Sequence, residues 1–528
     1  MIEEMIIQLT CIFTMSKNIE DTHEEIVQII EKANKELFAV GFPKGKSKLV
    51  TKIIHWDIRA EAFTFTITSG KYARAPSAVL RFRKLLAGEL GSKYKIGIRE
   101  VEVLSFEVKL PLEKSSTQLM DKIKALTYVQ DVTFGSGELN VHFRPMKEGE
   151  LKNNVPDRAL ALVEETIEKA GSSPSKVSVD KMTANVVRKG SVKSIRFQGE
   201  PSKIGVELGW IKEFPGRGQW VYTTPYVKLL EIIEDIIINE IIRKFDFQPF
   251  MLPKLIPLEV MRKMPGYLEN IPEGMYYVCH PPRDPEAFSK FKETMKVTKS
   301  IPKKMLKEII SEPEYVLAPA QCEPFWQFFS HETVRAETLP IKLYDRAGWT
   351  YRWEGGGVEA LTRIQEFRRI ELGYLGTPEQ VIYIRDAVRD KVVEIVDKTL
   401  DLEWRIVGAA PFYMKDVEIG DITESKNVSA YDVEVYLPYR GERESAEWLE
   451  IAACFIHKNK FVESFSVHEA RGLPMWTGCC GLGTSRWVAA FLATHGFKPE
   501  NWPKIVKEKF GTYKLPNTLL WPKNREET

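Results

Sequence analysis

The first 170 residues alternate between segments with the two-residue period of a strand and segments with the period of a helix. In Phe63-Thr-Phe-Thr-Ile-Thr68, apolar and polar residues alternate strictly, which is typical of a strand with one buried face. Asp21 and Thr22 precede a helical pattern and are suitable N-cap residues. On the same grounds we expect strands at 5–14, 94–110 and 127–143, and helices at 21–38, 77–88, 115–126 and 156–170. This mixture predicts an α+β domain whose sheet carries helices on one side.

A change of composition follows this first module. The segments Gly171-Ser-Ser-Pro-Ser and Arg188-Lys-Gly-Ser-Val-Lys-Ser are rich in Gly, Ser and Lys, which is typical of a linker. We therefore expect a mixed α/β domain at 1–180, a linker at 181–205 and a second domain at 206–528.

The second domain contains one long amphipathic helical pattern and one insert. The helix is expected at about 226–244, and its apolar stripe has the spacing of a buried helix face. Residues 286–312 contain two short helical patterns around Ser300-Ile-Pro302, which predicts an insert shaped like a helix-turn-helix.

The distribution of charge along the chain distinguishes the two domains, whereas the net charge of the whole chain does not. The 528 residues contain 75 Lys and Arg against 73 Asp and Glu, a net charge of only +2. Residues 44–99, however, hold 13 Lys and Arg and only three acids. Such a local excess of positive charge indicates a polyanionic partner for the first domain.

Cysteine usage and hydropathy indicate a cytoplasmic protein without a membrane partner. The cysteines show no spacing of a disulfide framework and are sparse for this length, which favours a reducing compartment. They are Cys11, Cys279, Cys322, Cys454, Cys479 and Cys480. The apolar N-terminus carries Glu3 and Glu4 and lacks a small-residue cleavage site, so it is a poor signal peptide. The Ile-rich run at 232–242 is too short to span a bilayer and contains three acids.

The most informative segment predicts a charged hairpin, formed by Tyr351–Glu354 and Arg363–Leu372 with a Gly-rich loop between them. Side chains alternate along a strand, so Arg352 and Glu354 share one face of the first strand. In the second strand the shared face carries Arg363, Gln365, Phe367, Arg369 and Glu371. Arginines can bind phosphates, an aromatic ring can stack on a base, and carboxylates can bind amino groups or metal ions. The alternative is a solvated charged hairpin with Phe367 in the core.

The pattern Arg352-x-Glu354, loop, Arg363-x-x-x-Phe367 resembles motif 2 of the class II aminoacyl-tRNA synthetases. The helix at 226–244 and the strand that ends near Pro253 resemble motif 1, which forms the dimer interface in that family. Gly478-Cys-Cys-Gly-Leu-Gly-Thr-Ser-Arg486 resembles motif 3. The resemblance implies a catalytic domain built on an antiparallel sheet flanked by helices, and a homodimer through the motif 1 region.

The same resemblance assigns the ATP-binding residues. It implies that Arg352 and Arg486 are catalytic, with Arg352 on the α-phosphate, and that Phe367 stacks on the adenine. Arg363 and Arg486 would bind the β- and γ-phosphates, and Glu354 would bind the adenine amino group. Glu450, in Glu450-Ile-Ala-Ala, matches the family residue that binds the magnesium ion of ATP, although a solvated strand-end acid is the alternative.

The amino acid is indicated by Ala360-Leu-Thr-Arg-Ile-Gln-Glu-Phe-Arg-Arg-Ile-Glu-Leu372, which lines up with the motif 2 segment of seryl-tRNA synthetases. The first domain lacks the long helical arm of ordinary seryl enzymes. With its mixed α/β domain, linker and insert, the whole chain resembles the methanogen-type, zinc-dependent seryl-tRNA synthetase. This implies activation of serine with ATP to seryl-adenylate, followed by transfer to tRNA(Ser).

In that subfamily two cysteines and one carboxylate bind a zinc ion in the serine pocket. Here they would be Cys322, Glu371 and Cys479, with Arg369 beside them in the serine pocket. Three protein ligands leave one position open for a substrate, and thiolates favour zinc over magnesium. Cys480 is an alternative to Cys479, because a slip of one residue exchanges them. Buried cysteines can also serve as small apolar residues.

The basic segment is expected to contact the tRNA backbone, through Arg74, Arg81, Arg83 and Lys84. The insert at 286–312 lies inside the catalytic domain, so we expect it to adjoin the active site and expect no DNA partner. Three alternatives remain at this point. They are a class II synthetase for threonine or phosphoserine, a non-catalytic RNA-binding paralogue, and an enzyme that loads a carrier protein.

Overall fold

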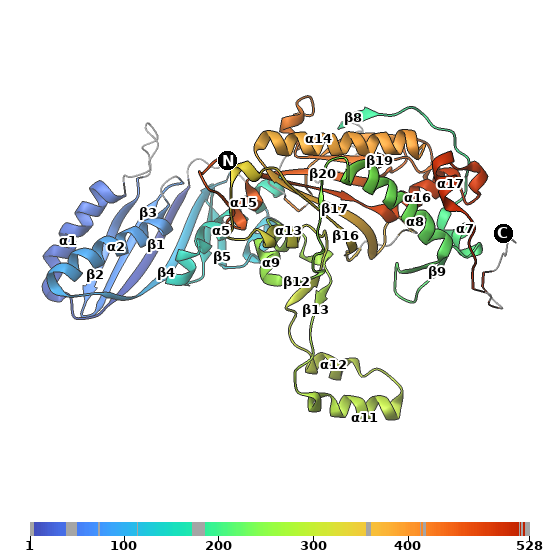
Figure 1. Ribbon diagram of the computed structural model, residues 1–528. Coiled ribbons are helices and arrows are strands. Elements are labelled where there is room, and N and C mark those ends of the chain that lie inside the picture. The colour runs from blue at the N-terminus through green and yellow to red at the C-terminus, as the bar shows by residue number, and fades with distance from the viewer. Residues whose placement is uncertain are drawn as a thin grey trace. The chain divides into compact units, whose positions relative to one another are not determined.

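The computed structural model describes residues 5–38, 50–71, 74–112, 115–171, 185–354, 359, 361–411, 413–414, 419–516, 518 and 521–522. The chain divides into two compact units, Met1–Lys176 and Val177–Thr528 (Figure 1). Each unit has its own hydrophobic core. The two units are described separately.

The first unit is an antiparallel sheet with the strand order β2-β3-β1-β4-β6-β5, and β7 pairs with β4. Its strands are β1 (Ile6–Met15), β2 (Lys52–Arg59), β3 (Ala62–Ser69), β4 (Ile98–Pro111), β5 (Val129–Gly135), β6 (Glu138–Phe143) and β7 (Met146–Lys147). Its helices are α1 (His23–Lys32), α2 (Ala75–Tyr94), α3 (Thr117–Lys124), α4 (Glu148–Lys152) and α5 (Val155–Gly171). Phe82 of α2 packs against Phe13, Phe63 and Phe65 of the sheet. The alternation in β1 and β3 therefore produced the expected buried face.

The second unit is built on a sheet of eight strands in the order β11-β16-β17-β22-β20-β19-β18-β8. All neighbours are antiparallel except β11 and β16. Its strands are β8 (Val186–Lys189), β11 (Gln248–Pro249), β16 (Ile341–Tyr351), β17 (Glu366–Gly376), β18 (Trp404–Ala409), β19 (Ala430–Val435), β20 (Leu449–Lys458) and β22 (Trp476–Leu482). The expected antiparallel catalytic sheet, preceded by a mixed α/β domain, is confirmed.

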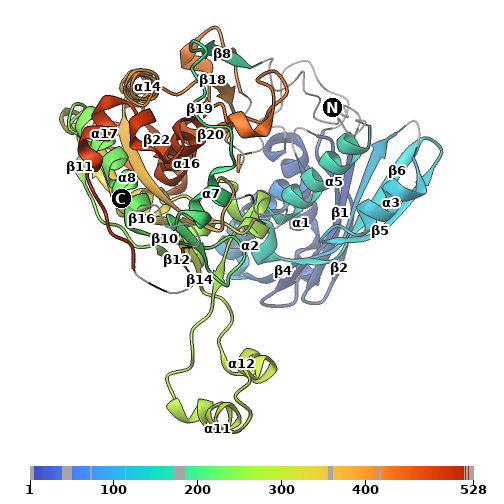
Figure 2. The same ribbon diagram turned by 90° about the vertical axis from the view of Figure 1, so that its right-hand side faces the viewer.

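Two apolar clusters cover the two faces of this sheet. On one face Ile370, Leu372 and Cys480 pack with α8 (Thr224–Ile237), α14 (Pro378–Glu394) and α16 (Thr484–His495). The other face carries Ala453, Phe455 and Cys479 and packs with short elements. These are β12 (Leu255–Pro257), β14 (Tyr315–Leu317), α9 (Leu258–Lys263), α10 (Tyr267–Asn270), α13 (Glu323–Phe328) and α15 (Lys460–Ser464), of which Figure 2 labels β12 and β14. Strand β13 (Tyr277–Val278) pairs with β14. The remaining elements are α7 (Pro201–Glu207), α17 (Lys504–Phe510), β9 (Ile211–Glu213) paired with β10 (Trp220–Tyr222), and β15 (Thr333–Val334) paired with β21 (His468–Glu469).

The stretch at 181–205, where the composition predicts a linker, contains regular structure. Strand β8 pairs with β18 at the edge of the large sheet, and α7 begins at Pro201. The described part of this stretch thus belongs to the second unit instead of forming a spacer. Its Gly- and Lys-rich composition hid β8, because an edge strand with exposed side chains needs little apolar sequence.

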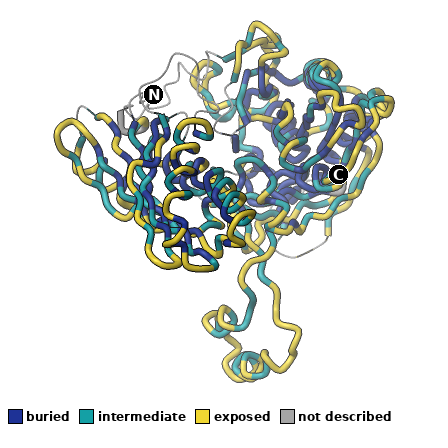
Figure 3. Tube along the Cα trace, turned by 90° about the vertical axis from the view of Figure 1, so that its left-hand side faces the viewer, coloured by how far each residue is buried: buried dark blue, intermediate teal, exposed yellow. Residues whose placement is uncertain are grey.

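The helix expected at 226–244 is α8, which continues as a π-helical turn over Ile238–Ile242. The insert forms two helices, as expected: α11 (Ser289–Thr298) and α12 (Lys303–Ile309). They lie at the end of two extended segments, and no residue of either helix is buried (Figure 3). At the base of this arm the backbone of Ser311 donates to the carbonyl of His280 at 2.9 Å, and the backbone of His280 donates to Ser311 Oγ at 3.0 Å. Among the described helices, none is long and apolar enough to cross a membrane.

Candidate active site

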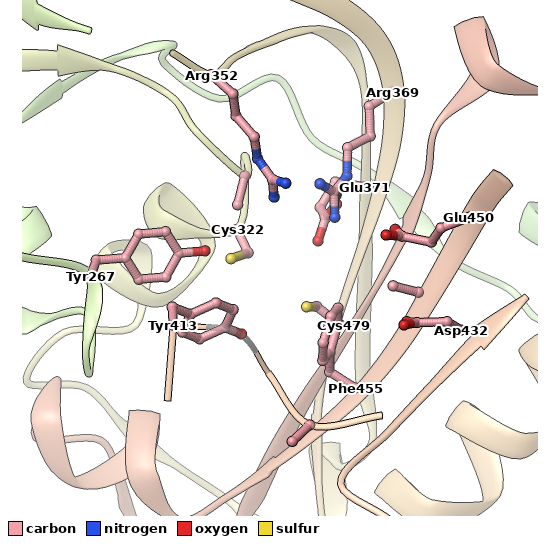
Figure 4. Close-up of a pocket in the computed structure, with 13 residues that line it drawn as sticks. Tyr267, Cys322, Arg352, Arg369, Glu371, Tyr413, Asp432, Glu450, Phe455 and Cys479 are labelled. Atoms are coloured by element: carbon pink, nitrogen blue, oxygen red, sulfur yellow. Dashed lines mark ion pairs between the residues drawn. The ribbon is translucent and has the colours of Figure 1, made fainter. Parts of the chain in front are cut away.

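A cavity of about 320 Å³ opens on the face of the large sheet opposite α14 and α16 (Figure 4). Strands β17, β22, β20 and β19 form its floor, and the segments around α10 and α13 contribute its wall. Its lining residues are Tyr267, Ala320, Cys322, Arg352, Arg369, Glu371, Ala410, Tyr413, Asp432, Glu450, Ala453, Phe455 and Cys479. Six of the residues singled out in the sequence, Cys322, Arg352, Arg369, Glu371, Glu450 and Cys479, therefore line one cavity.

The register between β17 and β22 places three of these side chains together. Glu371 pairs with Gly481, and Gly373 pairs with Cys479. Since alternate residues of a strand share a face, Glu371 and Cys479 both project into the cavity, with Arg369 on the same face. The sharing of a face by Arg369 and Glu371 was predicted from the alternation in the sequence.

The same alternation separates the two adjacent cysteines. Cys480 pairs with Leu372 and projects into the core on the opposite face of the sheet. There its sulfur lies 2.8 Å from Sγ of Cys454, which is also buried. Cys480 is thus directed away from the cavity that Cys479 lines.

Cys322, Glu371 and Cys479 converge on one point. One ligand atom from each lies within 4.8 Å of the others, and all three residues are buried. Cys322 reaches the cavity as the N-cap of α13, directly after Gln321, whose backbone is left-handed with φ of 74°. Neither carboxylate oxygen of Glu371 accepts a hydrogen bond, although Nε of Arg369 lies 2.7 Å from Oε2. Two thiols and a buried carboxylate fit the ligand preference of zinc.

Burial and one guanidinium govern the charge state of Glu371. Burial raises the pKa of the Glu371 carboxyl to about 7, and the adjacent Arg369 opposes this rise. Arg369 is 9% exposed, and its guanidinium lies flat against Gly481. A Cβ on Gly481 would lie 1.7 Å from Nη2 of Arg369. The glycine is therefore required for Arg369 to occupy this position.

Of the residues expected to bind ATP, Arg352 and Glu450 line the cavity, and Arg486 contacts Glu450. Nε of Arg352 donates to the carbonyl of Pro319 at 3.2 Å, which orients its guanidinium along the wall. Arg486 donates from Nη1 to the carbonyl of Glu450 at 3.0 Å, and the same nitrogen lies 3.6 Å from the Glu450 carboxylate. The Arg486 guanidinium carbon lies 5.7 Å from the centre of the Phe367 ring. Phe367 is buried. Its position is compatible both with stacking on the adenine and with a core residue.

Arg363 and Glu354 do not line the cavity. Arg363 is exposed, and its Nη2 lies 3.3 Å from the carboxylate of Glu447. The backbone nitrogen of Glu354 donates to Oε1 of Gln365 at 3.1 Å. Residues 355–358 and 360 of the intervening loop lie outside the described residues. The roles of Arg363 and Glu354 stay predictions.

Sequence reasoning missed the two tyrosines of the cavity wall. The rings of Tyr267 and Tyr413 lie 4.5 Å apart, and the hydroxyl of Tyr267 is buried without a hydrogen-bond partner. Tyr267 lies in the four-residue helix α10 and Tyr413 in a turn, and such short segments show no periodicity that marks a buried side chain. The cavity floor also contains Asp432 of β19. There, burial and the nearby Glu450 raise the pKa of its carboxyl well above the usual range.

The residues expected to bind tRNA lie on or beside α2, and three of them interact with other residues of the first unit. Arg74 forms an ion pair with Asp157 at 3.0 Å, and Arg83 lies 3.3 Å from Glu148. Arg81 donates to the carbonyl of Leu37. Lys84 is exposed. Residues 44–49 and 72–73 of the basic segment lie outside the described residues.

Comparison with known proteins places both units in families. Residues 5–165 match a family described as a tRNA-binding domain, and residues 306–495 match the class II tRNA synthetase core domain of the G, H, P, S and T enzymes. A type-2 serine–tRNA ligase of Methanopyrus kandleri is 39% identical over 96% of this chain and 98% of its own length. The corresponding enzyme of Methanothermobacter thermautotrophicus is 36% identical over 98% and 99%.

This chain is also similar to a protein whose crystal structure is known. M. kandleri SerRS in complex with tRNASec of A. aeolicus is 38% identical to this chain, with a TM-score of 0.79. The similarity covers 98% of this chain and 100% of that chain. The family resemblance expected from the sequence is confirmed. This chain is an aminoacyl-tRNA ligase and belongs to the type-2 serine–tRNA ligase family.

Proposed function

We propose that this protein activates serine with ATP, giving seryl-adenylate and pyrophosphate, and transfers the seryl group to the 3′ end of tRNA(Ser). The observation that carries this proposal is the convergence of Cys322, Glu371 and Cys479 in the cavity that Arg352 and Glu450 also line. A potential metal-binding group and a potential phosphate-binding group thus share one cavity of a size that suits a small substrate.

Cys322, Glu371 and Cys479 would hold a zinc ion, which supplies an open position for a free amino group. Arg369 opposes the rise in the pKa of Glu371 and lies where it can bind the serine carboxylate. Ala320, Ala410 and Ala453 supply apolar lining beside these charges. Small size alone discriminates weakly, since one extra methyl group changes binding by about 1–3 kcal/mol in an apolar pocket.

ATP would bind at the end of the cavity that Arg352 and Glu450 line, where Arg486 contacts Glu450. Arg352 stabilises the negative charge that develops on the α-phosphate as the serine carboxylate attacks it in line. Arg486, with Arg363, binds the β- and γ-phosphates, and Glu450 holds the magnesium ion of the nucleotide. Phe367 stacks on the adenine, and Glu354 accepts a hydrogen bond from its amino group. The protein mainly positions the reactants, because phosphoryl chemistry of this kind needs little covalent participation.

Serine-dependent exchange of pyrophosphate into ATP tests the activation step. We expect exchange with serine well above that with threonine, loss of exchange and of bound metal after chelation, and recovery of both with zinc. The control is the same protein taken through the same treatment without the chelator. Exchange with threonine or phosphoserine in place of serine would support a different class II synthetase. Metal-free protein with full serine exchange would remove zinc from the proposal.

The first unit would bind the tRNA backbone through its basic segment. Replacing Arg81 and Lys84 with glutamine should weaken tRNA binding and reduce its salt dependence by about one unit of slope per lost phosphate contact. Serine-dependent exchange should be unchanged. Lys124→Gln on α3 is a matched control, since Lys124 is an exposed lysine of the same unit. Unaltered tRNA affinity and charging in the double variant would exclude these two residues from the tRNA-binding surface.

We also propose a homodimer that forms through α8 and the segment after it, in a reducing cytoplasm. Exposed apolar side chains beyond α8 support this dimer, notably Met251, which is 84% exposed, and Leu255 at 45%. The six cysteines are all free, as expected in a reducing compartment.

A further inference from the structure

Glu234 is a buried carboxylate in the middle of an apolar helix. It lies on α8, is only 2% exposed, and is flanked by the buried residues Ile233 and Ile236. In the sequence it looks like an interruption of the Ile-rich run. A buried charge is unfavourable unless it is paired and hydrogen-bonded, so its partners define its role.

Three other elements of the second unit supply these partners. Nη2 of Arg368, on β17, donates to both carboxylate oxygens at 3.1 and 3.2 Å. Oγ1 of Thr484, at the start of α16, donates to Oε1 at 3.0 Å. A second guanidinium, that of Arg346 on β16, lies 3.8 Å from Oε2. One carboxylate thus connects α8 to β17 and to the N-terminus of α16.

These contacts lie directly beside the two side chains that would flank the nucleotide. Arg368 immediately follows Phe367, and its backbone nitrogen donates to Oγ of Ser485 at 2.8 Å. Thr484 and Ser485 immediately precede Arg486. The spacing between Phe367 and Arg486, 5.7 Å from ring centre to guanidinium carbon, is therefore set by two elements that Glu234 connects.

Stability alone does not explain a carboxylate at this position. Replacing a buried ion pair with well-packed apolar residues is often neutral or stabilising, and an apolar residue at 234 would continue the buried stripe of α8. A charge-assisted network instead fixes geometry, since each partner accepts only a narrow range of distances and angles.

We propose that Glu234 is a positioning residue for ATP: it holds Phe367 and Arg486 in register through Arg368 and Thr484. This inference rests on the proposed function, because it assumes that Phe367 and Arg486 bind the nucleotide. Glu234 touches no substrate. Replacing Glu234 should raise the KM for ATP and leave the KM for serine unchanged, since the residues that would bind the substrate serine are held by other contacts.

The test measures serine-dependent pyrophosphate exchange by the full chain. Glu234→Gln keeps the shape of the side chain but removes its charge and turns an amide group toward Arg368. We expect the KM for ATP to rise about tenfold, which corresponds to the loss of one or two hydrogen bonds to a charged group. The KM for serine and the metal content should stay within about twofold of the wild type.

Thr484→Val provides a milder variant that removes a single donor. We expect a rise of about threefold in the KM for ATP, and no further rise when Thr484→Val is added to Glu234→Gln, because both act through the same network. The double variant thus separates one shared network from two independent effects.

The matched control is Glu469→Gln, because Glu469 is also a buried carboxylate. It accepts hydrogen bonds from the backbone nitrogens of Ala336, Arg471 and Leu473 and does not line the cavity. We expect it to lower the melting temperature without changing the KM for ATP. An equal rise of the KM for ATP in Glu469→Gln would overturn the inference. An unchanged KM for ATP in Thr484→Val would overturn it as well, and this second test holds even if Glu234→Gln fails to fold. Absence of serine-dependent exchange in the wild type would instead overturn the proposed function.

Discussion

Replacing Cys479 with alanine is expected to remove the bound metal and to lower serine-dependent exchange about a thousandfold, a loss of several kcal/mol of transition-state stabilisation. Cys479 would supply one of only three protein ligands, and alanine offers no donor atom in its place. The measurements are metal content per chain by mass spectrometry and the rate of exchange at saturating ATP.

The adjacent Cys480 provides the control for this prediction. Cys480→Ala removes a sulfur atom of similar burial that faces the opposite side of the same strand. It should retain the metal and most of the activity, while the free energy of unfolding falls by about 1–2 kcal/mol because a small cavity is left in the core. Metal loss in Cys480→Ala, or full metal content in Cys479→Ala, would show that the assignment of the two neighbours is reversed.

Adding a single methyl group at Gly481 is expected to reduce serine activation about a hundredfold, because displacement of a substrate-binding group by about 1 Å can have that effect. The new Cβ would lie 1.7 Å from Nη2 of Arg369, so the guanidinium must leave its place beside Glu371. The backbone of Gly481 is not left-handed, so alanine causes no strain of its own. The loss should therefore appear in exchange and in the KM for serine, and the melting temperature should also fall, because the buried Glu371 loses its partner.

Gly274→Ala is the control for the general effect of replacing glycine. A Cβ on Gly274 would meet no atom within 4 Å, so this variant should behave as the wild type in both exchange and thermal unfolding. If Gly481→Ala also retains the wild-type KM for serine, Arg369 does not require its present position, and its role in the serine pocket is wrong.

The strand alternation around the cavity could be predicted, because it follows from a two-residue period that the sequence displays directly. Arg369 and Glu371 share the expected face for that reason. The choice between Cys479 and Cys480 could not be made in the same way. It depends on the register between β17 and β22, in which Glu371 pairs with Gly481. These two strands are far apart in the sequence, so no local pattern shows their register.

Other parts of the site had no local pattern at all. Cys322 enters the cavity from the N-cap of a six-residue helix, and Tyr267 from a helix of four residues. Such short elements show no periodicity from which burial can be predicted. Only the family resemblance indicated Cys322, and nothing indicated Tyr267. The network of Glu234 was hidden for a different reason, since a lone acid in an apolar run gives no indication of its partners.

The arm of α11 and α12 leaves and rejoins the second unit at residues that touch, His280 and Ser311. None of the residues in its two helices is part of the core. The arm is therefore a cassette, whose length and sequence can vary through evolution without altering the sheet. Lengthening a loop between fixed ends adds only about 0.6 kcal/mol of closure entropy for each doubling, so this position tolerates large insertions. The same property makes it a suitable place to splice in a reporter domain while the catalytic sheet stays intact.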